Sequence, residues 1–250
     1  MSNYEENIIK LYNEFISKKL RLDKKGITQN GKSRFATYPF IGSNYGTTKK
    51  ILFIGLDIGS DENSKIQTII ERRSTIEHPF IEAYNPHIAG TYFLSLYFLR
   101  DEYNWIDYWD NIKNCKKQSM QILKDIENRT KILPLPTEIN FMSFVALTNA
   151  HKFVTVGRTN RLGDQDRKTL SSLEFELLQS EIDTLEPDII CFQGKKFLKH
   201  KELLFNISKI GVKMYVGYHP SYVGTIREPR NLVKSYIQYK TKNHQKIASI

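Results

Sequence analysis

The stretch KKILFIGLDIGSDEN (residues 49–63) joins a short apolar run to a loop rich in glycine and acidic residues. The apolar run covers residues 51–56, and a run of this length and composition is typical of a strand that is buried on both faces. Asp57 and Gly59 follow directly, and a loop of this kind either binds an anion or presents a carboxylate. The stretch therefore predicts a buried strand whose carboxyl end carries chemistry.

Three more segments have the length and composition of buried strands, and helical segments alternate with them. The further strands are expected at FVALTN (144–149), DIICFQG (188–194) and VKMYVGY (212–218). Helices are expected at residues 4–20, 88–100, 107–128, 170–185 and 195–208, and a basic helix from about Pro229. The polar residues 23–48 are expected to form an irregular connection.

Short apolar strands that alternate with helices favour a mostly parallel sheet covered on both faces. We therefore expect an α/β protein, a three-layer α/β/α sandwich with a central, mostly parallel four-stranded sheet. The sequence shows no internal repeat and no clear boundary, so residues 1–250 are expected to form a single domain. In it, residues 1–48 supply an N-terminal helix and the irregular connection, residues 50–238 the core and residues 239–250 a basic tail.

The composition is that of a soluble globular protein, with 40% hydrophobic and 26% charged residues. No apolar run approaches the ~20 residues that span a bilayer. The start, MSNYEENIIKLYNEF, has no apolar signal-peptide core, so we expect a cytoplasmic protein without a membrane partner. Cys115 and Cys191 are not spaced as a metal-binding pair, and we expect neither a metal cluster nor a cofactor.

The net charge of +10 is concentrated in the last quarter of the chain. Residues 194–250 hold twelve Lys or Arg and two acids, Glu202 and Glu228, so this segment accounts for the whole excess. Concentrated positive charge favours a polyanionic partner, nucleic acid above all. A solvated basic surface would give the same composition.

Polar residues follow each of the four expected strands. The carboxyl ends of parallel strands meet at one edge of a sheet, where ligands bind. We therefore expect an acid, an amide and an imidazole to converge there. The residues in question are Asp57-Ile58-Gly59, Asn149-Ala150-His151, Gln193-Gly194 and His219-Pro220-Ser221.

One interpretation of the first loop is a phosphate-binding loop. IGLDIGS (54–60) resembles the first phosphate loop of the actin and sugar-kinase superfamily. In that family a β-hairpin follows, whereas the residues after Ser60 are charged and helix-prone. The family also needs two duplicated domains, which is more than 250 residues comfortably supply, and a second phosphate loop, which we do not find in the sequence. This ATP-binding interpretation therefore ranks below the next one.

Taken in order, four strand-end motifs resemble those of the uracil-DNA glycosylase superfamily. GLDIG (55–59) is similar to the water-activating Gly-x-Asp-Pro or Gly-x-Asn-Pro-Gly loop of that family. ALTNAHK (146–152), followed by TNR (159–161), is similar to the strand-end Asn motif and downstream Asn-Arg of its iron–sulfur branch. EIDTLEPDIICFQG (181–194) matches a helix–Pro–strand–Gly element, and YHPSY (218–222) is similar to the His-Pro-Ser loop that grips the substrate. The resemblance covers roughly residues 50–238, and it becomes meaningful in its structural context.

The chain also departs from this family. Ile58 stands in place of the usual proline of the first motif. The four cluster cysteines of the iron–sulfur branch are absent, and Phe153 stands where one is expected. The resemblance thus points to a cluster-free, divergent member.

The resemblance implies a monofunctional DNA glycosylase, acting as a monomer, that flips a pyrimidine out of DNA and hydrolyses its N-glycosidic bond. Asp57 would stabilise the cationic sugar and orient water, and His219 would donate to O2 of the departing base. Asn149 would bind the Watson–Crick edge, and either Tyr92 or Phe93 would stack on the base. The simpler alternatives are a helix cap for Asp57 and a packed loop position for His219.

Further residues are implied in binding DNA around the flipped nucleotide. Lys152 and Ser221 would hold flanking phosphates, and Arg161 belongs to the downstream Asn-Arg motif. Tyr222 or Val223 would wedge into the gap left by the base.

The base itself stays open at this point. Gly59 stands where the uracil-specific branch has a Tyr that excludes groups at C5, so uracil and a hydroxymethylated or glucosylated cytosine of phage DNA are both candidates. The first would mean repair and the second antiviral defence. Residues 60–86, which include Arg72 and Arg73, would line a larger pocket or form an exposed helical insertion. A non-catalytic DNA-binding module on the same fold is the alternative from another functional class.

Overall fold

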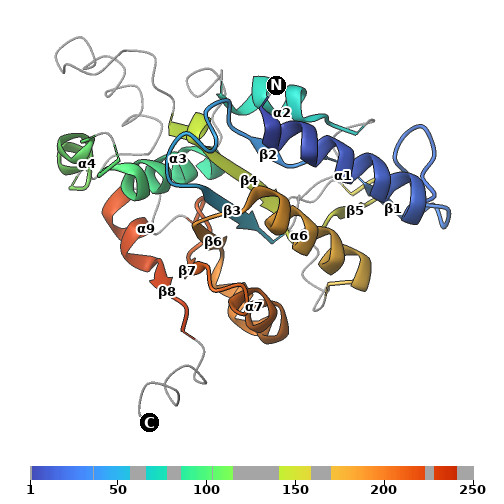
Figure 1. Cartoon of the computed structure of the whole chain (residues 1–250). Helices are drawn as coiled ribbons and strands as arrows, with labels where there is room; N and C mark the ends of the chain where they lie inside the picture. Colours follow the sequence, from blue (N-terminus) through green and yellow to red (C-terminus); the bar gives the residue numbers. More distant parts are fainter. Residues whose placement is uncertain are drawn as a thin grey trace.

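The computed structural model describes residues 2–35, 37–56, 66–77, 86–102, 104–114, 141–158, 170–222 and 228–240. These residues form a mixed α/β fold around a six-stranded sheet with the order β2-β4-β3-β6-β7-β8 (Figure 1).

Four parallel strands form the centre of this sheet. They are β3 (Ile51–Gly55), β4 (Val145–Asn149), β6 (Ile189–Gln193) and β7 (Lys213–Gly217). Within each of β3, β4 and β6 no more than one residue is even partly exposed, which explains why the apolar runs revealed them. The four strand positions expected from the sequence are therefore confirmed.

The central sheet has six strands, however, and the expectation of four was wrong. β2 (Phe40–Ile41) pairs antiparallel with β4, and β8 (Ile237–Gln238) pairs antiparallel with β7. Each has two residues, too few for a recognisable period in the sequence. The basic helix expected from Pro229 is correspondingly short, because α9 (Pro229–Ser235) ends and the chain returns along the edge of β7.

A second, two-stranded sheet joins the polar connection 23–48 to the residues that follow β4. β1 (Ser33–Phe35) pairs antiparallel with β5 (Phe153–Thr155), which follows β4 closely. The polar connection 23–48 is thus partly strand.

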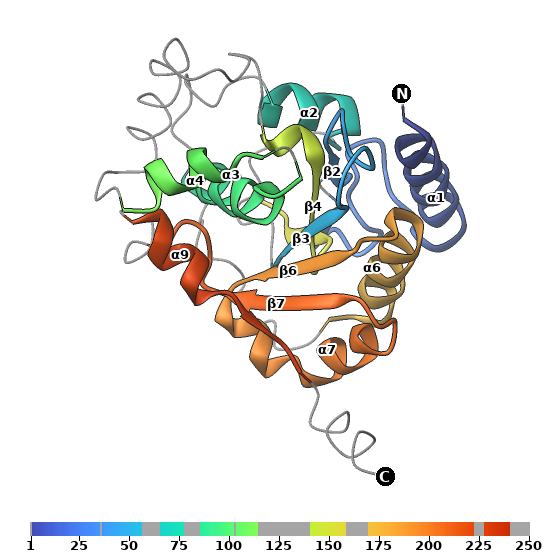
Figure 2. The same ribbon diagram turned by 60° about the vertical axis from the view of Figure 1, so that its left-hand side comes forward.

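Different helices cover the two faces of the central sheet (Figure 2). Ile51 and Phe53 pack toward one face, together with residues of α3 (Pro86–Leu99), α4 (Ile106–Ile112), α9 and the 3-10 helix η1 (Phe141–Phe144). Leu52 and Ile54 pack toward the other face. That second face is covered by α1 (Asn3–Lys19), α6 (Ser172–Leu185), α7 (Lys201–Ser208) and the 3-10 helix η2 (Lys195–Lys199). α2 (Ile69–Glu77) contributes one buried Ile to each face.

Capping residues fix where the helices α1 and α6 of the second face begin and where α6 ends. Ser2 and Ser171 each form a capping box, with Glu5 and Glu174 respectively, at the start of α1 and α6. α6 ends at Glu186, which has a left-handed backbone with φ 45°, and Pro187 follows it. None of the described helices is both long enough and apolar enough to cross a membrane.

The return from α9 to β8 depends on a close approach at Gly217. A Cβ atom added at this glycine would lie 2.3 Å from the ring of Tyr236, which lies between α9 and β8. We expect Gly217→Ala to lower the free energy of unfolding by about 1–3 kcal/mol, because the ring must shift to admit the methyl group. Urea unfolding in a Tyr236→Leu background provides the check, since the cost of the alanine should largely disappear there. An equal cost in both backgrounds would place the strain elsewhere.

Candidate functional site

The strand order of the central sheet places a topological switch point at the carboxyl ends of β3 and β6. From β3 the chain passes to β4 on one side and then crosses to β6 on the other side of β3. Open α/β sheets bind ligands where successive connections leave in opposite directions in this way. The residues that follow β3 from Asp57 to residue 65, and hence Gly59, lie outside the described residues.

Four residues at this edge lie in one row across the parallel strands. Gly55 is in register with Asn149 of β4 and with Gln193 of β6, which in turn is in register with Gly217 of β7. The side chains of a strand alternate between its faces, so both amides of this row point to the face covered by α3, as Phe53 does two positions earlier. The register therefore brings two amide side chains from different strands to one side of the sheet.

The side chain of Asn149 packs over Gly55 of the neighbouring strand, which is possible because Gly55 has no side chain. A Cβ atom added at Gly55 would lie 2.4 Å from Oδ1 of Asn149. Asn149 itself is half-buried at the end of β4. The glycine of the first motif and the asparagine of the second are thus packed against each other.

Gln193 is fully buried and fixed by two residues of α3. Its Nε2 donates to Oγ1 of Thr91 over 2.8 Å, and its Oε1 lies 2.8 Å from Nε2 of His87. The Thr91 hydroxyl donates its own proton to the His87 carbonyl, so toward Gln193 it acts as the acceptor. It follows that the Gln193 carbonyl accepts from His87, and that Nε2 of His87 carries the proton.

His87 is kept neutral by its surroundings. Burial, and secondarily the neighbouring His219, lower the pKa of His87 to about 3. The two imidazole rings meet edge to face, with 4.7 Å between their centroids. A neutral ring with an assigned tautomer therefore lies against His219.

His219 is oriented by Ser221 of the same loop. The Ser221 hydroxyl lies 2.7 Å from Nδ1 of His219, and the Ser221 backbone N–H donates to the same nitrogen over 3.3 Å. Because Nδ1 accepts, Nε2 carries the proton of the neutral ring. Desolvation lowers the pKa of His219 below its ordinary value, although part of the side chain is exposed at the rim. His219 is thus a neutral N–H donor at neutral pH.

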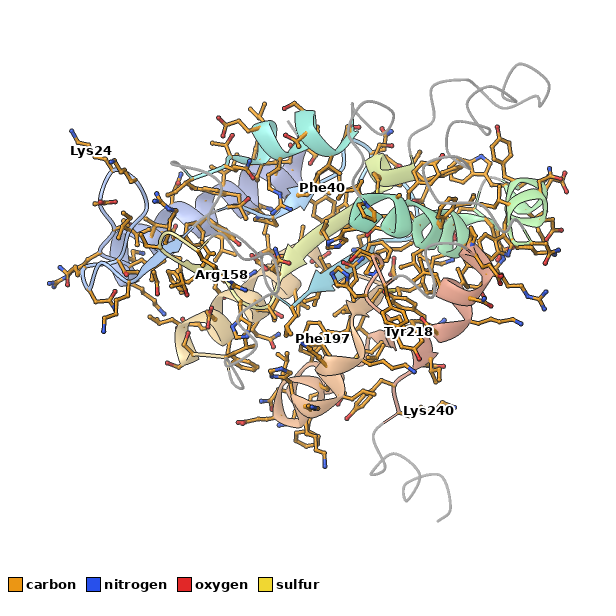
Figure 3. All side chains as sticks on the ribbon, turned by 180° about the vertical axis from the view of Figure 1, so that it is seen from behind. Lys24, Phe40, Arg158, Phe197, Tyr218 and Lys240 are labelled. Atoms are coloured by element: carbon orange, nitrogen blue, oxygen red, sulfur yellow. The ribbon has the colours of Figure 1, made fainter. Side chains whose placement is uncertain are left out.

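The loop that carries His219 is held by α3 and α9. A Cβ atom added at Gly90 of α3 would lie 2.6 Å from the Pro220 carbonyl oxygen, so helix and loop are in direct contact. At the start of the loop, the Tyr218 N–H donates to Oγ of Ser235, and the Tyr236 hydroxyl donates to the Tyr218 carbonyl. Figure 3 shows Tyr218 beside α9.

Lys152 lies in a different environment from the one its motif suggested. Its side chain is 3% exposed, and Nζ donates to Oε2 of Glu181 over 2.6 Å and to Oγ1 of Thr148 over 2.8 Å. Tyr12 of α1 also donates to Glu181, which is fully buried. An ammonium group enclosed in this way cannot reach a DNA phosphate, so the predicted contact is corrected to a structural role between β4, α6 and α1.

The other predicted site residues fall into three groups. Tyr92 and Phe93 are buried in the core on the α3 face, where Tyr92 packs against Phe141 with 5.0 Å between ring centroids. Their role in stacking on a base stays a prediction, and their packing in the core gives both side chains a structural role. Tyr222 is 53% exposed. Asp57, Gly59, Arg161 and Val223 lie outside the described residues.

The arginines of the segment 60–86 are bound to the N-terminal part of the chain. Arg72 donates to the Tyr38 carbonyl over 3.0 Å, and Arg73 pairs with Glu5 and donates to the Ile41 carbonyl. These contacts favour an architectural role for both side chains over the lining of a pocket.

Sequence reasoning missed His87 and Thr91 as members of the site. Gln193 was expected at a strand end. The stretch HIAGTYF (87–93) gives no local signal that the first turns of α3 lie over β6. Among the described residues, no group of three or more His, Cys, Asp or Glu side chains is arranged to hold a metal ion.

Neither a scan against protein-family models nor a search of curated proteins finds a match for this chain.

The structural role of Lys152 predicts a stability effect. We expect Lys152→Met to lower the free energy of unfolding by about 3–5 kcal/mol, because Glu181 stays buried without its cation. The double variant Lys152→Met/Glu181→Leu should recover much of this loss, since it removes both charges. Urea unfolding of the three proteins tests this, and a single variant as stable as the parent would contradict the structural role of the ion pair.

His87 predicts a pH effect on stability. Its pKa is about 3 in the folded chain and ordinary, near 6.5, in the unfolded chain, so below pH 6.5 only the unfolded chain binds this proton. The free energy of unfolding should therefore fall by about 1.4 kcal/mol per pH unit on this account as the pH drops from 6.5 toward 3. In His87→Gln, which keeps a donor for Gln193 but cannot titrate, this component should vanish. Urea unfolding between pH 4.5 and 7 measures it, and parallel pH curves for the two proteins would contradict the assignment.

Proposed function

We propose that the protein is a DNA glycosylase with the three-layer α/β/α architecture of the uracil-DNA glycosylase superfamily. The observation that carries the proposal is the state of His219, a neutral imidazole held with Nε2–H as donor at the carboxyl edge of the sheet. The row of Asn149, Gly55 and Gln193 lies at the same edge. The four parallel strands occupy the positions that the motif order requires, which supports the comparison with this family.

The proposed reaction breaks the bond between C1′ of the sugar and N1 of a pyrimidine. As the bond breaks, positive charge develops on the sugar and negative charge on the base. A neutral N–H donor such as His219 stabilises the oxygen on which the negative charge gathers, and donates without needing to be protonated first. Held in place by Ser221, the ring loses little orientational freedom when the transition state forms.

Asn149 is proposed to bind the flipped base. An amide offers both a donor and an acceptor, so it can pair with the Watson–Crick edge of either pyrimidine. Packing against Gly55 limits its movement. Asp57 comes two residues after Gly55 in the chain and is proposed to stabilise the sugar cation and to orient the attacking water.

The partner is proposed to be DNA, and the substrate a flipped uracil or C5-modified cytosine. The basic segment 194–250 supplies the charge that attracts the phosphate backbone. Every lysine of this segment that the structure describes is exposed, among them Lys195, Lys199 and Lys240.

Base release is tested directly. Single- and double-stranded oligonucleotides that contain uracil, 5-hydroxymethylcytosine or its glucosylated form are incubated with the protein, and abasic sites are then cleaved with alkali. We expect strand cleavage at one of these bases, with and without EDTA. DNA binding without any abasic product would instead support the non-catalytic DNA-binding module. Activity that EDTA abolishes and magnesium restores would support a nuclease or an ATP-dependent enzyme.

Variants of His219 and Asn149 should separate chemistry from folding. We expect His219→Ala to lower the single-turnover excision rate about 10²–10³-fold, the usual effect of losing one preorganised donor. His219→Gln, which offers an amide N–H in its place, should retain more activity. Asn149→Ala should weaken discrimination between bases as well as the rate. Melting temperatures should stay close to the parent, because both side chains lie at the edge of the sheet.

The role of Asp57 needs two substitutions, because the family that the motif resembles carries either Asp or Asn in this loop. Asp57→Ala should lose activity to the same degree as His219→Ala, whereas Asp57→Asn is expected to fall between Ala and the parent. Normal excision by both His219→Ala and Asp57→Ala would refute the proposed mechanism.

A further inference from the structure

An exposed aromatic stack lies beside His219 and has no part in the chemistry proposed above. The rings of Tyr218 and Tyr222 are nearly parallel, with 4.9 Å between centroids and 13° between planes. Nζ of Lys195 lies 4.0 Å from the centroid of the Tyr218 ring. The stack therefore joins two aromatic rings and a cation from two neighbouring strand ends.

The stack is fixed in position relative to the candidate site. The Tyr222 N–H donates to the His219 carbonyl over 2.9 Å, so Tyr222 lies within one turn of the imidazole. Tyr218 is bonded through its backbone to Ser235 and Tyr236. Lys195 follows Gly194 at the carboxyl end of β6, whose Gln193 belongs to the site. The aromatic stack and the candidate site thus lie on the same strand ends.

Tyr222 remains exposed to solvent within the stack. The side chain is 53% exposed although one of its faces packs against Tyr218. Exposed aromatic rings beside lysines are the usual surface on which proteins stack the bases of single-stranded nucleic acids. Lys195 and the exposed Lys196 and Lys199 provide the positive charge that follows the backbone.

The same geometry argues against insertion into a duplex. A side chain that wedges between base steps is contacted by bases on both sides. Tyr222 can offer at most one face to a base, because Tyr218 covers the other. Contact through one face suits the end of a stack, as in a single strand whose bases are already unpaired.

We propose that Tyr222, backed by Tyr218 and Lys195, is a stacking platform for the base next to the flipped nucleotide in single-stranded DNA. The identity of the flipped nucleotide rests on the proposed function. The stacking contact itself does not, because it can be measured on DNA that holds no excisable base.

The test is binding of a fluorescein-labelled oligothymidylate, followed by fluorescence anisotropy, beside a duplex of the same length. We expect Tyr222→Ala to weaken binding of the single strand about 5- to 150-fold, the range that corresponds to one stacked base. Tyr222→Phe should bind nearly as the parent does, and Tyr222→Leu should be as weak as the alanine variant. Lys195→Gln should lower the slope of log affinity against log salt by about 0.7, as loss of one contact to a single strand does.

The chain offers a matched control. Phe205 of α7 is 42% exposed and has Nζ of Lys209 4.5 Å from its ring centroid, yet it lies on another element. Phe205→Ala should leave binding of the single strand unchanged.

Several outcomes would overturn the platform. Unchanged binding of the single strand by Tyr222→Ala would refute the proposed stacking contact. Failure of the parent protein to bind the single strand would refute it as well. If the loss were confined to the duplex and Tyr222→Leu restored binding, Tyr222 would be a wedge. Absence of base release with stacking intact would overturn the proposed function alone, so the two failures are distinguishable.

Discussion

The register of the four parallel strands is the constraint on which the site depends. Asn149, Gly55, Gln193 and Gly217 stand opposite one another across β4, β3, β6 and β7. A shift of one residue in any pairing would turn the side chain of that strand to the opposite face of the sheet. The buried apolar residues that precede each of these positions prevent such a shift, since it would also move their side chains from one face of the sheet to the other. The core therefore fixes which polar groups meet at the edge.

Side chains alternate between the two faces of β4, so its ionic contacts and its site residue lie on opposite faces of the sheet. Thr148 points to the α6 face, where it bonds with Lys152 and Glu181 in a fully buried ionic network. Asn149, the next residue, points to the α3 face and the candidate site. The charged groups that tie β4 to α6 and α1 are thus kept on the opposite side of the sheet from the neutral imidazoles of His87 and His219.

The sequence predicted the central strands, and it placed Asn149, Gln193 and His219 at or just after their carboxyl ends, because both are local properties. Continuous apolar runs revealed β3, β4, β6 and β7, and the rule on carboxyl ends then identified Asn149 and His219 as neighbours of one edge. What depends on long-range packing was missed. His87 enters the site only because α3 lies over β6. Lys152 is withdrawn from the surface because Glu181, 29 residues away, accepts a hydrogen bond from its ammonium group. The two-residue edge strands have no periodic pattern to read.

The neutrality of the imidazole pair follows from the same arrangement. The buried bond from His87 to Gln193 uses its Nε2 proton, and burial makes a second proton on this ring costly. His219 therefore meets a neighbour that does not become charged near neutral pH. A donor that is already neutral gains most from a substrate on which negative charge develops, since a protonated ring would bind anions in the ground state as well. An edge that keeps two imidazoles neutral is thus better suited to stabilising developing negative charge than to holding a permanently charged phosphate. Under the proposed function, the phosphate contacts would therefore fall to the exposed lysines that follow Gly194.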